Sequence, residues 1–211
     1  SSMALCSLLH NCLLTRAVGM ARLVVWPLAL SALLTFEISM EFESEKEGDI
    51  ERRQDVLEVE GAVLQWYYAV TGMHPHRKRI GQFGNLSTGS SMDRHDIELF
   101  TRLSALFSPQ HIFIVGNAWG YSTLVLSYIF DTASVDAIDP GIEGQNGMEG
   151  ISLTRKVAAF AQRNVAVHVG YSPKDTHRAL RSKGQPYELA FIDGLHTNVQ
   201  MFEDFTGIYP H

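Results

Sequence analysis

The stretch His111-Ile-Phe-Ile-Val-Gly-Asn-Ala-Trp-Gly-Tyr-Ser-Thr-Leu124 decides the fold class of this 211-residue chain. Residues 111–115 are mostly apolar and rich in β-branched side chains, which predicts a buried strand. Gly116 and Gly120 bracket a turn, and the apolar run that follows predicts a buried helix over 124–130. A strand, a glycine turn and a buried helix in this order are typical of an α/β sheet.

The same alternation continues towards the C-terminus. Short apolar runs predict three further strands, at 134–138, 165–169 and 187–192. Strands that alternate with helices form a parallel sheet with right-handed crossovers and helices on both faces. The predicted fold class is therefore α/β, doubly wound, with a mainly parallel sheet. Apolar residues at helical spacing predict the accompanying helices at 96–107, 151–163 and 173–182.

Composition divides the chain into four segments. An apolar segment covers 1–36, an acidic linker 37–53, a helix with an irregular connector 54–91, and the α/β domain 92–211. Valine and aromatic residues at three- and four-residue steps predict an amphipathic helix over 54–70. The ten acids between 37 and 60 are typical of a solvated linker or helix face.

The overall composition excludes several classes of protein. The formal net charge of −6 argues against a dedicated nucleic-acid binder, which needs clustered Lys and Arg. Two cysteines, Cys6 and Cys12, form neither a disulfide framework nor a zinc-ligand spacing. With 45% apolar residues the chain has enough material for a packed core, and we expect a cytoplasmic protein.

The N-terminal apolar segment allows more than one interpretation. Residues 17–36 are almost continuously apolar, interrupted by Arg22 and Pro27, and a helix is predicted over 23–36. Such a helix needs an apolar partner, either the rest of the protein or a second subunit of a homo-oligomer. The alternatives are a membrane-associated or targeting segment, since the run is close to the length of a membrane span, and a segment without a physiological role.

Each of the four predicted strands ends in a glycine or an acid. These are the loop Gly116–Gly120, then Asp139, Gly170 and Asp193. In doubly wound sheets the ligand lies beyond the carboxyl ends of the strands. Glycines let a ligand approach the backbone, and a carboxylate about 20 residues after the loop can accept both hydroxyls of a ribose. The pattern indicates a cofactor that contains a nucleoside.

The loop itself distinguishes between such cofactors. A dinucleotide site favours G-x-G-x-x-G, whereas Gly116–Gly120 lacks the central glycine and carries Trp119. The stretches IFIVGNAWGYSTLVLS, VDAIDPG and YELAFIDGLHT resemble class I S-adenosylmethionine-dependent methyltransferases, in particular their small-molecule O-methyltransferase-like branch. The resemblance covers about residues 92–205. It departs from the family pattern at Ile114, where an acid is frequent, and at Ala118, where glycine is frequent.

The resemblance implies a Rossmann-like methyltransferase fold, S-adenosylmethionine as cofactor, and methyl transfer to a hydroxyl oxygen of a small-molecule acceptor. It also implies a set of cofactor contacts. The loop would curve around the methionine part, Asp139 would bind the ribose, and Asp193 would lie beneath the sulfonium. The implied cofactor-binding residues are Gly116, Asn117, Ala118, Trp119, Gly120, Ser122, Asp139, Tyr171, Ser172 and Asp193.

Methyl transfer to a hydroxyl requires a group that takes the proton of the acceptor. Asp193 and His196 are the candidates, although a helix-start histidine bonded to its neighbours is an equal interpretation of His196. Some members of the family bind a divalent metal at the equivalent acid, so Asp193 is also a candidate Mg²⁺ ligand. The alternative functions are an NAD-type oxidoreductase and a non-catalytic cofactor-binding or interaction module.

The predicted sheet is incomplete by comparison with the family. The methyltransferase fold has seven strands, and four are predicted in this sequence. The open sheet edge beyond the fourth strand needs a cover, because an uncovered edge favours aggregation. We expect that the chain is a fragment, that a partner completes the sheet, or that the N-terminal apolar helices cover the edge.

Overall fold

The computed structural model describes residues 22–25, 48–72, 92–142, 148–180, 184–195 and 197–209. Its described residues form a five-stranded sheet with the strand order β1-β5-β2-β3-β4. Four of these strands are parallel, as predicted, and β1 is antiparallel to β5. The strands are β1 (Arg22–Val25), β2 (His111–Val115), β3 (Ser134–Asp139), β4 (Val165–Val169) and β5 (Leu189–Ile192).

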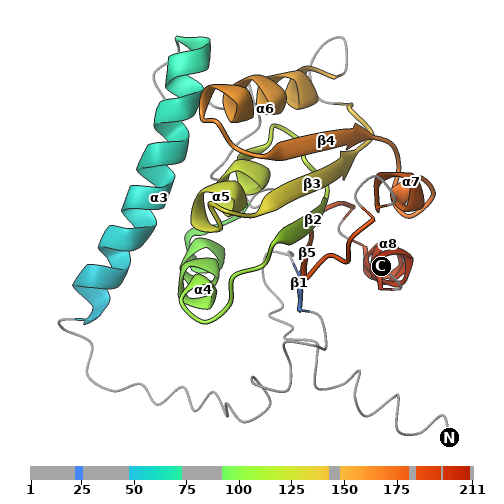
Figure 1. Cartoon of the computed structure of the whole chain (residues 1–211), viewed down its shortest axis with the longest axis horizontal. Helices are drawn as coiled ribbons and strands as arrows, with labels where there is room; N and C mark the ends of the chain where they lie inside the picture. Colours follow the sequence, from blue (N-terminus) through green and yellow to red (C-terminus); the bar gives the residue numbers. More distant parts are fainter. Residues whose placement is uncertain are drawn as a thin grey trace, which may run out of the picture.

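Helices cover both faces of the sheet, which confirms the doubly wound arrangement (Figure 1). Four helices lie over one face, and two lie over the other. The first group is α3 (Gly48–Thr71), α4 (Arg94–Ser104), α5 (Tyr121–Ile129) and α6 (Glu149–Phe160). The second group is α7 (Thr176–Leu180) and α8 (Asn198–Ile208).

Strand β1 corrects the prediction of a helix over 23–36. Residues 22–25 pair with β5 in the register Arg22↔Ile192 to Val25↔Leu189. The free N–H and C=O groups along the edge of β5 can bond to a strand but not to a helix, and Leu-Val-Val favours the extended form. One expectation was that the N-terminal segment covers the open sheet edge. It does so, but as a strand and not as a helix. Residues 26–36 lie outside the described residues.

Helix α3 is longer than predicted. It begins at Gly48, inside the segment assigned to the acidic linker, and ends at Thr71. Glutamate has a high helix propensity, so the acidic residues extend the amphipathic helix instead of interrupting it. Val56, Val59 and Val63 are buried, as their spacing predicted. In the described part of the chain, no helix is both long and apolar enough to cross a membrane.

Helix α4 begins two residues before the predicted start and ends three residues before the predicted end. Its N-cap is Asp93. The Asp93 carboxylate accepts the backbone N–H groups of His95 and Asp96, and Asp96 accepts the N–H of Asp93. This reciprocal capping box fixes the direction in which α4 leaves the loop.

Four other helices differ from the sequence prediction. Helix α6 begins two residues before the predicted start and ends three residues before the predicted end. Helix α5 begins at Tyr121, directly after Gly120, because Gly120 has a left-handed φ of 87° and acts as its N-cap. Helix α7 is shorter than predicted because residues 172–175 form a turn in which the Asp175 N–H donates to the Tyr171 carbonyl. Helix α8, which follows β5, was not predicted from the sequence.

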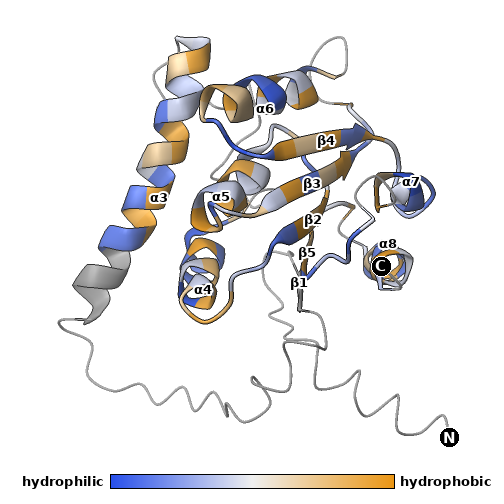
Figure 2. Cartoon of the chain, viewed as in Figure 1, coloured by the Kyte–Doolittle hydropathy of each residue, from blue (hydrophilic) through white to orange (hydrophobic). Residues whose placement is uncertain are grey.

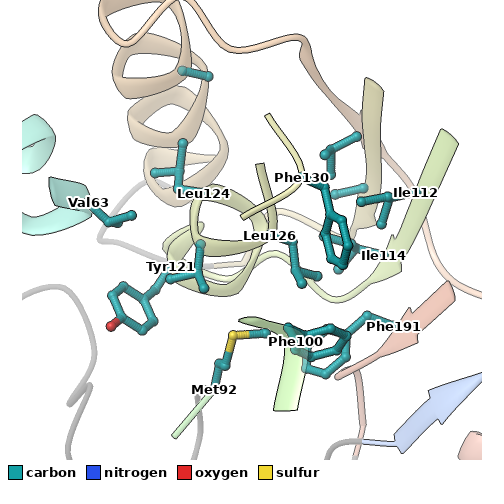
Figure 3. Packing of buried hydrophobic residues seen from close by; sticks show 14 of the residues in the cluster. Val63, Met92, Phe100, Ile112, Ile114, Tyr121, Leu124, Leu126, Phe130 and Phe191 are labelled. Atoms are coloured by element: carbon teal, nitrogen blue, oxygen red, sulfur yellow. The ribbon is translucent and has the colours of Figure 1, made fainter. Parts of the chain in front are cut away.

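The larger of two hydrophobic cores lies between the sheet and helices α3 to α6. The ring of Phe100 meets those of Phe191 and Phe130 edge to face, at centroid distances of 5.5 and 6.5 Å (Figure 3). On the other face, Tyr187 packs against Phe113 at 5.1 Å. In Figure 2, apolar residues (orange) lie along the strands and on the sides of the helices that face the sheet. Both cores fix the strands whose carboxyl ends carry the predicted site.

Candidate functional site

The residues that follow the four parallel strands meet at one edge of the sheet. Backbone hydrogen bonds connect these strand ends in order across the sheet. The bonds run from Gly116 N to Ile138 O at 2.9 Å, from Gly170 N to Asp139 O at 2.9 Å, and from Asp193 N to Val115 O at 2.8 Å. The structure therefore brings together the four strand-end signals that the sequence analysis identified.

The glycine loop between β2 and α5 depends on both of its glycines. Gly116 has a φ of 91°, and a side chain there would collide with the backbone carbonyl of Asp193. Gly120 has a φ of 87°, and a Cβ there would collide with the side chain of Thr154. Ala118 also has a positive φ, 44°, which is unfavourable for a residue with a Cβ. This explains why glycine is frequent at that position in the family the sequence resembles.

Asp139, the predicted ribose ligand, holds the glycine loop in this structure. Its Oδ2 accepts the backbone N–H groups of Asn117 and Ala118 at 2.7 and 2.8 Å, and its Oδ1 accepts that of Gly141 at 2.7 Å. The side chain is 4% exposed. A carboxylate offers about four acceptor positions, so these three bonds leave about one for a ligand.

Asn117, a predicted cofactor contact, is directed into the protein. Its Nδ2 donates to Thr154 Oγ1 and to the Ala118 carbonyl, both at 3.0 Å, and its Oδ1 accepts from Thr123 Oγ1 at 3.0 Å. Its backbone carbonyl accepts the N–H of Gly120. The structure thus gives Asn117 the task of shaping the loop.

Trp119, within the loop, and Ser122, just after it, connect the loop to the helical layer. Ser122 is buried in the first turn of α5. Trp119 is half-buried against the larger core, and its carbonyl accepts a hydrogen bond of 2.8 Å from the hydroxyl of Tyr67 in α3. The loop is therefore held from outside the α/β domain as well as from within it.

Tyr171 and Ser172 follow β4 on the same edge of the sheet. Tyr171 is 61% exposed, and its backbone N–H donates to Asp175 Oδ2 at 3.0 Å. Ser172 accepts from Thr176 through its hydroxyl and from Gln200 through its carbonyl. These contacts fix the turn, and Tyr171 remains exposed.

Asp193 is the candidate group for proton transfer. It is half-buried at the end of β5, and its N–H is bonded to Val115. Burial and, to a smaller extent, the negative charge of Asp96 at the start of α4 together raise the pKa of the Asp193 carboxyl to about 8. Burial also raises the pKa of Asp96. A carboxyl that titrates near neutral pH is suited to general acid and base catalysis.

The other predicted catalytic and metal features receive less support. His196 lies outside the described residues. Within the described ranges, there is no group of three or more His, Cys, Asp or Glu side chains that could hold a metal ion. Asp193 by itself does not fit a Mg²⁺ ion, which needs several oxygen ligands in octahedral geometry.

Sequence reasoning missed three residues that organise this edge. Tyr67 was counted among the apolar residues of its helix, and Thr154 lay inside a predicted helix with no polar signal. Asp204 belongs to α8, which was not predicted. It is buried, and its Oδ1 accepts a hydrogen bond of 2.9 Å from Gln200, the residue that also bonds to Ser172. Their roles depend on contacts between elements that are distant in sequence.

This parallel sheet, with a glycine loop after its first parallel strand and acids after the second and fourth, has the Rossmann-like fold of class I S-adenosylmethionine-dependent methyltransferases. The structure of the O-methyltransferase TomG from Streptomyces achromogenes, in complex with SAM, matches 72% of this chain with a TM-score of 0.51. At 17% identity this likeness shows the fold alone. The chain spans 60% of the length of TomG.

Two further solved structures are similar at lower scores. The SAH-bound methyltransferase PaMTH1 from Podospora anserina matches 78% of this chain and 66% of its own, with 14% identity and a TM-score of 0.45. The O-methyltransferase from Bacillus cereus, in complex with SAH, matches 61% of this chain and 60% of its own, with 17% identity and a TM-score of 0.41. No family model and no curated protein matches the sequence.

Proposed function

We propose that this chain binds S-adenosylmethionine at the carboxyl edge of its sheet and transfers the methyl group to a hydroxyl oxygen of a small molecule. The observation that carries the proposal is the convergence of the glycine loop, Asp139, Tyr171 and Asp193 at one edge of a methyltransferase-like sheet. The loop is tightly shaped by its glycines and by Asp139, and Tyr171 offers an accessible ring. This combination suits a cofactor with a nucleoside at one end and an amino acid at the other.

The residues present fit this cofactor. The turn around the exposed Ala118 would curve past the methionine part, and Ser122 lies at the start of α5. The Tyr171 ring would stack on the adenine, beside Ser172. The remaining acceptor position of Asp139 would take one ribose hydroxyl, a smaller share than the two hydroxyls expected from the sequence.

S-adenosylmethionine supplies an electrophilic methyl group on its sulfonium. The chain must align the acceptor with that methyl group and remove the proton of the acceptor hydroxyl. Asp193 lies at the edge where this proton would be released, and its pKa of about 8 makes its carboxylate a base near neutral pH. His196 remains the second candidate for this role. No step is assigned to Mg²⁺, because the described residues do not supply its ligands.

A non-catalytic cofactor-binding module is the second candidate function. It is favoured by the finding that Asn117 and Asp139 use most of their polar groups on the protein itself. The NAD-type oxidoreductase is less well supported, because Ala118 and Trp119 occupy the part of the loop that would approach a pyrophosphate. The cytoplasmic location and the homo-oligomer or membrane contact through 17–36 remain predictions.

Calorimetric titration with S-adenosylmethionine, its demethylated product and NAD tests the proposed cofactor. We expect saturable binding of the first two and none of NAD, and the opposite pattern would refute the proposal. Release of the demethylated cofactor is then measured with phenolic, aliphatic hydroxyl and carboxylate acceptors, with and without Mg²⁺. Clear binding with no turnover on any acceptor would favour the non-catalytic module.

The variant Asp193→Asn tests the role of the acid. As a base it should be needed for turnover much more than for binding, so kcat should fall by about 10²–10⁴-fold, the usual contribution of a general base. The affinity for S-adenosylmethionine should change little. Equal losses in turnover and affinity would show that Asp193 serves binding instead.

A further inference from the structure

Helix α3 reaches the glycine loop although it lies outside the α/β domain in sequence. It crosses the helices that cover the larger core (Figure 1), and the Tyr67 hydroxyl in its C-terminal half donates to the Trp119 carbonyl at 2.8 Å. The two residues are 52 positions apart. A side-chain hydrogen bond thus joins α3 directly to the loop.

The peptide bond that receives this hydrogen bond is conformationally important. Its carbonyl belongs to Trp119 and its N–H to Gly120, which has a φ of 87°. Glycine tolerates several backbone conformations, so a peptide next to it can rotate at small cost. Tyr67 holds the carbonyl of this peptide, and the carbonyl of Asn117 holds its N–H at 2.6 Å. Together the two bonds select one orientation of the peptide.

Tyr67 itself is held firmly in place. The neighbouring Trp66 ring lies 5.6 Å from that of Tyr128, and the Arg163 guanidinium lies 5.1 Å from the Trp66 centroid and 5.6 Å from that of Tyr128. Arg94 and Glu60 form an ion pair of 2.8 Å between α4 and α3. These contacts fix α3 close to Tyr67, so its hydroxyl is presented to the loop in a defined position.

The Tyr67 hydroxyl remains a neutral donor throughout the physiological pH range. Burial raises the pKa of Tyr67 far above its ordinary value, and the nearby Tyr121 raises it further. The hydrogen bond to Trp119 is therefore insensitive to pH around neutrality. Asp139 and Thr154 hold the first half of the loop from the α/β domain, and Tyr67 holds its second half.

We propose that Tyr67 is a positioning residue for the cofactor loop, which it sets through the Trp119 carbonyl without touching the cofactor. This inference rests on the proposed function in so far as the loop binds S-adenosylmethionine. The effect on the loop itself is independent of that function. Without the hydroxyl, the 119–120 peptide should sample other orientations, and a ligand would have to select the competent one.

The test uses Tyr67→Phe in the full chain, with Tyr68→Phe as the matched control, because Tyr68 is adjacent and more exposed. Amide hydrogen exchange of the ligand-free protein should become faster at 117–120 in Tyr67→Phe only. The affinity for S-adenosylmethionine should fall by about 3- to 10-fold, the effect of one neutral hydrogen bond. The melting temperature should fall much less than it would after truncation of a buried core side chain.

Two outcomes would overturn the inference. One is unchanged loop exchange in Tyr67→Phe, and the other is an equal effect in Tyr68→Phe. If Tyr67→Phe unfolds, 3-fluorotyrosine at position 67 retains the ring and the donor, and it should keep wild-type loop exchange; faster exchange there would also refute the inference. If the wild type does not bind S-adenosylmethionine, the proposed function fails while the exchange result still decides the role of Tyr67.

Discussion

The two faces of the sheet are packed very differently. Among the residues that the structure describes, a cluster of 23 buried residues fills the space between α3 to α6 and the sheet, whereas the cluster under α7 and α8 contains nine. Helix α8 buries Met201 and Ile208 but leaves Val199 and Phe202 70% and 66% exposed. Within the described ranges, more apolar side chains are buried on the first face than on the second.

The two faces of the sheet hold different parts of the candidate site. Two of the groups that hold the glycine loop, Thr154 at Asn117 and Tyr67 at Trp119, come from α6 and α3 on the thickly packed face. The turn after β4, with Tyr171 and Ser172, is held from the thinner face through Gln200 of α8. The loop that shapes the site is therefore held from the face with the larger buried cluster.

The largest expected effect compares the two faces directly. Phe100→Ala removes a fully buried ring that contacts two others, and should lower the free energy of unfolding by about 3–5 kcal/mol. Phe202→Ala removes an exposed ring and should change it by less than about 0.5 kcal/mol. Urea unfolding of both variants measures the difference. Equal losses of unfolding free energy in the two variants would show that the α8 face around Phe202 is buried in solution.

The second prediction concerns the acid between the two faces. Because the pKa of Asp193 is about 8 in the folded protein and about 4 in the unfolded one, the folded state binds the proton more tightly. Stability should therefore decrease as the pH rises from about 4 to 8 and level off above it. Asp193→Asn should abolish this decrease and, at pH 9, stabilise the protein by about 2–3 kcal/mol, a value discounted for solvent screening.

Thermal unfolding of the wild type and Asp193→Asn between pH 5 and 9 checks this expectation. Asp175→Asn is a suitable control, because the pKa of Asp175 is lowered by the Tyr171 N–H and its side chain lies on another turn. A wild-type protein whose stability rises steadily over that pH range would contradict the assignment.

The third prediction concerns the contact between the loop and the thick face. In Gly120→Ala the new methyl group would collide with the buried Thr154 side chain, at a φ unfavourable to alanine. We expect a loss of about 1–3 kcal/mol in unfolding free energy, together with weaker cofactor binding. Gly184→Ala is the control, since it also has a positive φ but open space around it. Calorimetric melting of both separates collision from backbone strain.

The smallest effect is expected at Ala118. Its φ of 44° and exposed position mean that glycine would relieve strain there without leaving a cavity. Ala118→Gly should stabilise the protein by about 0.5–1 kcal/mol, after the entropic cost of glycine is subtracted. Chemical unfolding measures this change, and a clear destabilisation would show that the methyl group makes contacts that the loop requires.

Much of the fold could be predicted because it depends on local pattern. The strands at 111–115 and 165–169 have the predicted bounds. Strand β1 was predicted as a helix because an apolar run gives no periodicity that separates the two forms. Its pairing with β5 depends on the open edge of a strand more than 160 positions later in the sequence.

The sequence by itself determined the α/β alternation, the glycine loop and the acids at the strand ends, because backbone preferences and apolar spacing act over a few residues. Only the tertiary structure decided what those groups do. It turned the oxygens of Asp139 towards loop amides, buried Asp193 beside Asp96, and brought Tyr67 to the Trp119 carbonyl. Hydrogen-bond partners and burial arise from elements that pack together across long sequence separations, and no local pattern records which atoms will meet.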